Sequence, residues 1–334
     1  MFRKHLAGER PGLTHYFESL APRPKLALDL TTLPFTPELK LDFGSGDVLR
    51  HYSRGVDRGL VQEISRFEGV EPETIMVTSG ADMGLEMALT HLLDPGDDIG
   101  INAPAFPRFG QIAAELCGAR VKFFGSVGEI PKAKVVVINT PNNPSTKMIM
   151  KKELEEAISS NSGAFFIIDG VFSAFEQPGL ASLAERFQNI AFINSVSKSH
   201  GLAGLRVGWI VSKRENLEQF RRGVSNFHTP LFNQKIAAEA LGKGGFVRNA
   251  REFLDAEFFF LKKKIRASLV RESAVPFYLV NVDDSKEIAR KLLERGVSVV
   301  DCSTFPGMGR EHIRVRIGNR EENGMFAEEL NVIL

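Results

Sequence analysis

A lysine set among hydroxyl side chains is the feature of this 334-residue chain best suited to chemistry. It lies in the segment Ser195-Val-Ser197-Lys198-Ser-His-Gly-Leu-Ala-Gly-Leu-Arg206, which begins where an apolar run ends. A buried ammonium is costly, so an enclosed lysine has a lowered pKa and becomes an amine nucleophile. The two serine hydroxyls and the guanidinium could together hold a phosphate. The alternative, an ordinary loop lysine beside small polar residues, stays equally open on this motif alone.

Three more residues stand at the ends of apolar or rigid segments. Asp169 ends the run Phe165–Ile168, where its carboxylate could pair with a pyridinium nitrogen or cap a helix. Asn143, in the turn 140–144, could donate to a phenolic oxygen or serve only the turn. Phe106, between two prolines, could stack on a heterocycle or pack in the core. Taken singly, the structural interpretations of Asp169 and Asn143 are favoured.

Further candidates for binding a ligand lie in the first hundred residues and near the C-terminus. Gly80-Ala81-Asp82 joins a predicted strand to a predicted helix, and the free amides of a helix start bind phosphate. Tyr52 lies in a polar stretch, so its hydroxyl could meet a ligand or solvent. Arg314 and Arg316 alternate with apolar residues, which puts both on one face of a strand. They could bind a carboxylate, or form salt bridges on a solvent-facing edge strand.

Alternating strands and helices position these residues. Strands are predicted at residues 74–77, 99–102, 121–124, 135–139, 164–169, 190–195 and 207–211, with helices at 60–67, 82–93, 109–117 and 151–159. This alternation indicates an α/β domain with a mostly parallel sheet, whose ligands bind beyond the carboxyl ends of its strands.

The two ends of the chain differ from this middle part. Residues 215–268 are predicted to be mainly helical, and the tail mixes strands at 277–282, 298–300 and 312–317 with a helix at 286–295. We therefore expect an N-terminal arm (1–40) that joins the small domain, a large domain (41–240) and a small α+β C-terminal domain (241–334).

The composition excludes several classes of function. The chain is 43% hydrophobic and 25% charged with a net charge of +1, so nothing favours nucleic acid or an anionic membrane. It has no membrane-span run and no signal-peptide core. Two cysteines form neither a disulfide framework nor a zinc motif, and the seven histidines are scattered. We expect a cytoplasmic protein without a metal.

Taken in order, these segments resemble the fold-type I pyridoxal-phosphate (PLP) enzymes, specifically the class I/II aminotransferases and most of all histidinol-phosphate aminotransferase. The resemblance runs from about Tyr52 to Glu329. It is carried by residues 195–208, Ser79–Asp82, Pro104–Phe106, Pro141–Pro144, Asp169 and 313–323. Each segment is weak alone, but their order and spacing together are specific.

The resemblance implies a role for each candidate. Lys198 would form the Schiff base with PLP and act as general base, Asp169 would bond the pyridine nitrogen, and Asn143 the O3′ oxygen. The phosphate would be held by the Gly80 turn through the amides of Ala81 and Asp82, and by Ser195, Ser197 and Arg206.

Phe106 would stack on the ring, and Arg314 would bind the substrate α-carboxylate. Tyr52 would reach the phosphate of a neighbouring subunit, which implies a homodimer acting on an amino donor and a 2-oxo acid.

The chain also departs from the family pattern. Phe172 replaces the usual tyrosine, so we expect a higher Schiff-base pKa than in tyrosine-bearing relatives. Val300 replaces the arginine that binds a substrate phosphate; Arg23, Arg54, Arg310 and Arg316 are possible substitutes. Thr31-Thr32-Leu33-Pro34 replaces Asn-Glu-Asn-Pro, and Ser145-Thr146 replaces Thr-Gly.

These departures keep two alternatives to an aminotransferase open. One is a PLP-dependent lyase such as a threonine-phosphate-like decarboxylase, because the same lysine and aspartate serve both reactions. It would release carbon dioxide without needing an oxo acid. The other is a non-catalytic PLP-binding protein, since a fold alone does not establish catalysis.

Overall fold

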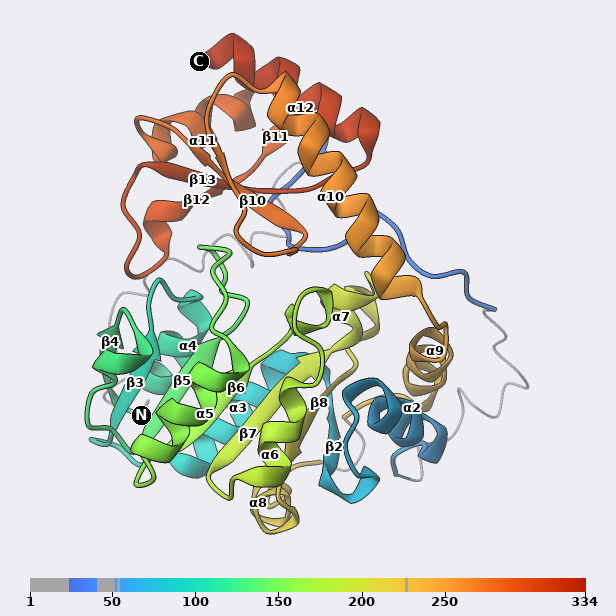
Figure 1. Cartoon of the computed structure of the whole chain (residues 1–334), viewed down its shortest axis with the longest axis vertical. Coiled ribbons are helices and arrows are strands. Elements are labelled where there is room, and N and C mark those ends of the chain that lie inside the picture. The colour runs from blue at the N-terminus through green and yellow to red at the C-terminus, as the bar shows by residue number, and fades with distance from the viewer. Residues whose placement is uncertain (1–23, 41–51, 53–54, 226–227) are drawn as a thin grey trace.

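A seven-stranded sheet forms the centre of the larger domain. The computed structural model describes residues 24–40, 52, 55–225 and 228–334, and Figure 1 shows them in colour. The strands are β2 (Ile75–Thr78), β3 (Asp98–Asn102), β4 (Arg120–Phe124), β5 (Val135–Asn139), β6 (Phe165–Asp169), β7 (Ile190–Ser195) and β8 (Gly208–Ser212). Their order is β2-β8-β7-β6-β5-β3-β4. Strand β8 runs in the opposite direction to the other six strands of this sheet. The predicted α/β fold with a mostly parallel sheet is confirmed.

Helices cover both faces of this sheet because its central strands are apolar on both sides. Val136 and Ile138 of β5 pack in one core, and Val135 and Val137 in the other, as the two-residue period of a strand requires. The first core is closed by α2 (Arg58–Glu68), α5 (Lys151–Ser160) and α9 (Leu231–Leu241). The second is closed by α3 (Gly80–Leu92), α4 (Pro107–Gln111) and α8 (Arg214–Phe220).

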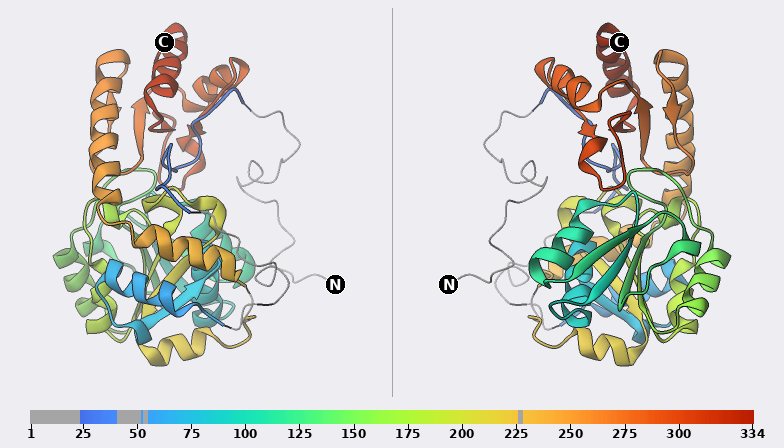
Figure 2. Two further views of the ribbon diagram at one scale, coloured as in Figure 1. Left: turned by 90° about the vertical axis from the view of Figure 1, so that its right-hand side faces the viewer. Right: turned by 90° about the vertical axis from the view of Figure 1, so that its left-hand side faces the viewer.

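The smaller domain is α+β, as predicted. Its antiparallel sheet has the order β12-β13-β10-β9, with β9 (Leu269–Val270), β10 (Phe277–Asn281), β12 (Val300–Asp301) and β13 (His312–Arg316). The helices α10 (Phe246–Lys264), α11 (Ser285–Glu294) and α12 (Arg320–Ile333) contribute to its core. Figure 1 shows α10 extending from the larger domain along the smaller one. Both views in Figure 2 also show the smaller domain above the larger one.

The described part of the N-terminal arm packs on the smaller domain. Strand β1 (Leu26–Ala27) pairs in parallel with β11 (Val297–Ser298), and the Arg316 amide donates to the carbonyl of Leu28 at 2.9 Å. Leu26, Leu28 and Leu33 are buried in the same core as β10 and β13. The domain boundaries near residues 40 and 240 stay predictions.

Several elements differ from the predicted ones. The strand expected at 298–300 is two short strands in different sheets, because the chain passes there from β1 to β13. The helix expected at 109–117 begins at Pro107 and changes to a π-helical turn at Ile112–Leu116. Helix α12 was not among the predicted elements, although Asn319 and Glu322 form a capping box at its start.

No helix in the described parts of the chain combines the length and apolar character needed to cross a membrane.

Gly208 gives a direct test of the packing between β8 and the start of α3. A Cβ there would lie 2.5 Å from the carbonyl carbon of Gly80 and 2.7 Å from the nitrogen of Ala81. Because these are backbone atoms, Gly208→Ala should lower the free energy of unfolding by about 1–3 kcal/mol, measured by denaturant unfolding. Gly324→Ala is the control: its added Cβ meets nothing within 4 Å in α12, so it should stabilise by about 0.5–1 kcal/mol. A Gly208→Ala protein as stable as the wild type would contradict this packing.

Candidate active site

A cavity of about 730 Å³ lies at the carboxyl ends of the central strands, as expected for an α/β sheet. Asp169 reaches it from the end of β6, Lys198 from the short helix α7 (Val196–Ser199) after β7, and Arg314 from β13 of the smaller domain. Most predicted site residues line this cavity: Ala81, Asp82, Phe106, Asn143, Asp169, Ser195, Ser197, Lys198, Arg206 and Arg314. The fold therefore brings together residues that are far apart in the sequence.

Lys198 and Asp169 have opposite pKa shifts. Burial, together with the nearby charges of Arg314 and Arg206, lowers the pKa of Lys198 to about 8, and the carboxylate of Asp169 opposes this shift. Burial also raises the pKa of Asp169 to about 6, although the Val171 amide donates to its carboxylate at 3.2 Å. Near neutral pH, the carboxylate is thus mostly ionised and an appreciable part of the lysine is a neutral amine, which is the nucleophilic form.

Asn139 is a site residue that the sequence reasoning missed. It ends β5 and lies opposite Asp169 in the parallel register. Its Oδ1 accepts from the Asn143 amide at 2.7 Å, and its Nδ2 donates to the Asp169 carbonyl at 3.2 Å. One side chain thus ties together the backbones of two predicted site residues. The signal available in the sequence was a polar residue ending an apolar strand, as at Asp169.

Arg314 is buried, with 3% of its surface exposed. Its Nη1 donates to Asn143 Oδ1 at 2.5 Å, and its Nη2 donates to the Asp29 carbonyl at 2.7 Å. The guanidinium also lies over the rings of Phe277 and Phe305, 5.6 and 5.2 Å from their centres. Strand β13 lies inside its sheet, so the alternative of a solvent-facing edge strand is excluded.

The two described substitutes for the missing phosphate-binding arginine, Arg310 and Arg316, do not line the cavity. Arg316 donates to the Ala27 carbonyl and to Glu322, so it joins the arm to α12. Arg310 is exposed and pairs with Asp284. Arg23 and Arg54 lie outside the described residues. Val300 pairs with Arg314 across β12 and β13 and is not one of the residues that line the cavity.

The start of α3 and Arg206 form a cradle for an anion. Gly80 has a φ of +77°, which strains any residue with a side chain, and a Cβ there would lie 2.5 Å from Nη2 of Arg206 and displace that guanidinium. The guanidinium therefore lies against the first residue of a 13-residue helix, and Ser195 and Ser197 line the same cavity. Amides, hydroxyls and a guanidinium that converge in this way fit a phosphate.

Thr146 stands where the resemblance described above implies a glycine. Its φ of +64° lies in the left-handed region, which is unfavourable for a β-branched residue. Hydrogen bonds across the domain boundary offset that strain. Its Oγ1 accepts from the Glu272 amide at 2.9 Å, and its carbonyl accepts from the Ser273 hydroxyl at 2.5 Å. The loop that carries Asn143 is thereby fixed to the smaller domain.

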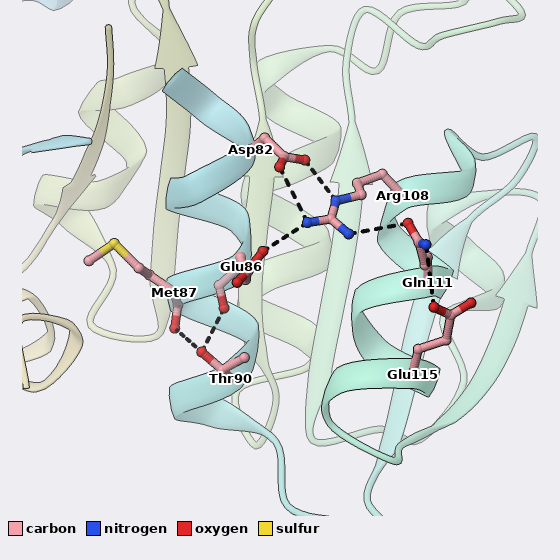
Figure 3. A network of polar contacts seen from close by, with 7 residues as sticks. All are labelled: Asp82, Glu86, Met87, Thr90, Arg108, Gln111 and Glu115. Atoms are coloured by element: carbon pink, nitrogen blue, oxygen red, sulfur yellow. Dashed lines mark hydrogen bonds and ion pairs between the residues drawn. The ribbon is translucent and has the colours of Figure 1, made fainter. Parts of the chain in front are cut away.

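An ion-pair network joins α3 to α4, and the sequence reasoning missed it. Figure 3 shows the Arg108 guanidinium between the two helices, with two hydrogen bonds to Asp82 and one each to Glu86 and Gln111. Gln111 in turn donates to Glu115 at 3.3 Å. Helix α3 begins with the predicted phosphate-binding amides, and α4 begins just after Phe106. The network therefore fixes these two sides of the cavity relative to each other.

The aromatic candidates separate into two groups. Phe106 and Phe172 line the cavity, where Phe106 packs edge-on against Phe109 (5.8 Å) and Phe172 against Phe277 (5.3 Å). Tyr52 is 80% exposed and is not a lining residue of this cavity. Its predicted role in a neighbouring subunit's site stays a prediction.

Comparison with known proteins identifies the family. Residues 32–330 match the family described as aminotransferase class I and II. The chain belongs to this family. It is 30% identical to histidinol-phosphate aminotransferase 1 of Archaeoglobus fulgidus over 315 residues, which cover 90% of this chain and 97% of the relative.

Solved structures agree in fold with this aminotransferase. Histidinol-phosphate aminotransferase from Sinorhizobium meliloti, in complex with pyridoxal-5'-phosphate, has a TM-score of 0.82 at 17% identity and covers 93% of this chain and 91% of its own. L-threonine-O-3-phosphate decarboxylase from Porphyromonas gingivalis has a TM-score of 0.76 at 18% identity, covering 92% and 99%. The predicted fold type and PLP as the cofactor are confirmed, and the chain is a PLP-dependent enzyme.

The Arg108 network should contribute modestly and in a salt-dependent way to stability. The side chain of Arg108 is 21% exposed, while those of Asp82 and Glu86 are 47% and 45% exposed. Arg108→Met should lower the unfolding free energy by about 1 kcal/mol at low salt, and the difference should shrink in concentrated salt. Arg214→Met is the control, because its pair with Glu218 is largely exposed and should contribute little. Equal stability of Arg108→Met and the wild type at low salt would refute the assignment.

Proposed function

We propose that this aminotransferase moves an amino group between an amino acid or related amine, of the histidinol-phosphate type or another, and a 2-oxo acid. The reaction would be of the ping-pong type, with PLP held covalently by Lys198. The observation that carries the proposal is one cavity in which a lysine of lowered pKa lies near Asp169, Arg206 and Arg314. Each of these side chains suits a different part of the cofactor or substrate.

The cavity residues fit PLP group by group. Arg206, Ser195, Ser197 and the amides of Ala81 and Asp82 would hold its phosphate, and Phe106 would lie against its ring. Asp169, ionised above pH 6, would keep the ring nitrogen protonated. The Asn143 amide has its oxygen bonded to Arg314, which leaves its Nδ2 to donate to the ring oxygen. When bound, the cofactor supplies a ring that accepts the electrons of the substrate Cα–H bond.

The remaining chemistry comes from Lys198 and Arg314. The Lys198 amine, with a pKa of about 8, suits removal and return of the proton at the substrate Cα. Arg314 would orient the α-carboxylate of an amino acid or oxo acid through paired hydrogen bonds. A donor without an α-carboxylate, such as histidinol phosphate, would leave Arg314 to serve the second substrate alone.

We also infer that the working unit is a cytoplasmic homodimer. Tyr52, exposed in the single chain, would contribute its hydroxyl to the phosphate site of a second copy. The observation that favours this arrangement is that Tyr52 precedes α2, outside the cavity of its own chain.

A screen of amino donors with 2-oxoglutarate tests the activity. We expect glutamate to form with one or more donors and without release of carbon dioxide, and Lys198→Ala to lower kcat by about 10²–10⁴-fold. The exposed Lys152→Ala should match the wild type. Phosphorylated and unphosphorylated donors belong in the same screen, because Val300 replaces the expected arginine. Carbon dioxide release without an oxo acid would instead identify a decarboxylase.

The lowered pKa of Lys198 predicts how cofactor uptake depends on pH. Only the neutral amine attacks an aldehyde, so the rate at which the apoenzyme takes up PLP should rise with pH and level off above about 8. Stopped-flow absorption of the cofactor measures this rate. A rate still rising toward the pKa of a solvated lysine, about 10.4, would contradict the assigned burial.

A further inference from the structure

A buried carboxylate lies in the core of the larger domain, at the end of α2. Glu68 is 4% exposed. Its Oε1 accepts two hydrogen bonds, from Asn194 Nδ2 at 2.8 Å and from Trp209 Nε1 at 2.9 Å. Burial raises the pKa of Glu68 to about 7, although the hydrogen bonds from the two donors act in the opposite direction. A buried carboxylate is costly unless it is hydrogen-bonded, and both of its donors belong to neighbouring strands of the central sheet, Asn194 to β7 and Trp209 to β8.

Asn194 connects Glu68 to the predicted phosphate site. Its Oδ1 accepts from the Ser195 amide at 2.8 Å, while its Nδ2 donates to Glu68. An amide side chain has one accepting and one donating end, so an acceptor at Glu68 fixes which end faces Ser195. Ser195 ends β7 and lines the cavity beside Lys198.

Trp209, the second donor to Glu68, lies next to the part of the predicted phosphate site that the start of α3 forms. Trp209 follows Gly208, where an added Cβ would lie within 3 Å of backbone atoms of Gly80, Ala81 and Asn194. The residue before Glu68, Phe67, packs against Trp209 with ring centres 6.2 Å apart and against His200 at 5.4 Å. The end of α2 thus supports β7, β8 and the turn after Lys198 at one place.

We propose that Glu68 is a positioning residue for the cofactor phosphate, acting through the Asn194 amide on the backbone of Ser195. The inference rests on the proposed function, because Ser195 binds phosphate only if that proposal holds. Glu68 touches neither cofactor nor substrate in this role. It sets the position of a residue that does.

Two substitutions of Glu68 separate positioning from general stability. Glu68→Leu removes the acceptor and leaves two buried donors unpaired, so PLP affinity should fall about 10- to 100-fold. Glu68→Gln keeps an accepting oxygen and should restore affinity to within about threefold of the wild type. Equilibrium dialysis of the holoenzyme against PLP, followed by its visible absorption, measures both. At saturating PLP, kcat and the donor KM of Glu68→Leu should stay within about threefold of the wild type, because Glu68 touches neither the substrate nor Lys198 in this role.

Glu257 supplies the matched control. It is also 4% exposed and accepts from Asn323 Nδ2 at 2.8 Å, but it lies in α10, in the core of the smaller domain. Glu257→Leu should therefore lower the melting temperature while leaving PLP affinity within about twofold of the wild type. If Glu68→Leu does not fold, Asn194→Ala makes the same test, because it breaks the link and leaves Glu68 bonded to Trp209.

The outcomes are distinguishable. Weaker PLP binding in Glu68→Leu or Asn194→Ala, with rescue by Glu68→Gln and no effect of Glu257→Leu, supports the positioning role. A folded Glu68→Leu or Asn194→Ala protein with wild-type affinity, or an equal loss in Glu257→Leu, overturns it and leaves the proposed function intact. A wild-type protein that takes up no PLP overturns the proposed function and this inference together.

Discussion

The buried charge of Arg314 is the constraint on which the rest of the site depends. A guanidinium with 3% of its surface exposed needs hydrogen-bond partners, because an unpaired buried charge costs several kcal/mol. Its partners come from the N-terminal arm at Asp29 and from the loop of the larger domain at Asn143. The two domains and the arm therefore meet around one side chain, and the cavity lies where they meet.

This arrangement also accounts for the reactivity of the site. Arg314 and Arg206 lower the pKa of Lys198 beyond the effect of burial, while Asp169 opposes them from the end of β6. The same guanidinium bonds the oxygen of Asn143 and so orients its amide nitrogen. Asn139, which lines the cavity, holds backbone groups of Asn143 and Asp169, and Asn194 holds the amide of Ser195. Amide side chains thus fix the residues that carry the chemistry, and Glu68 fixes one of those amides.

Features that depend on a local pattern of residues could be predicted from the sequence. Features that depend on how distant elements pack against each other could not. Apolar strands ending in Asp169 and Ser195 predicted the sheet and the edge at which ligands bind, and motif order predicted Lys198, Arg206 and Arg314. Contacts such as Arg108 with Asp82, or Trp209 with Glu68, join residues 26 and 141 positions apart. They depend on how helices and strands are rotated against one another, which no short motif encodes. Helix α12 had a local signal in its capping box, and the split of 297–301 between two sheets had none.

Visible absorption of the purified protein, followed by borohydride reduction and peptide mass analysis, tests the central claim most directly. The account predicts a yellow protein whose reduced pyridoxyl group is attached to Lys198, in a peptide that contains the neighbouring serines. Attachment to another lysine would contradict the assignment of Lys198. A colourless protein that takes up no added PLP would contradict the proposed function itself.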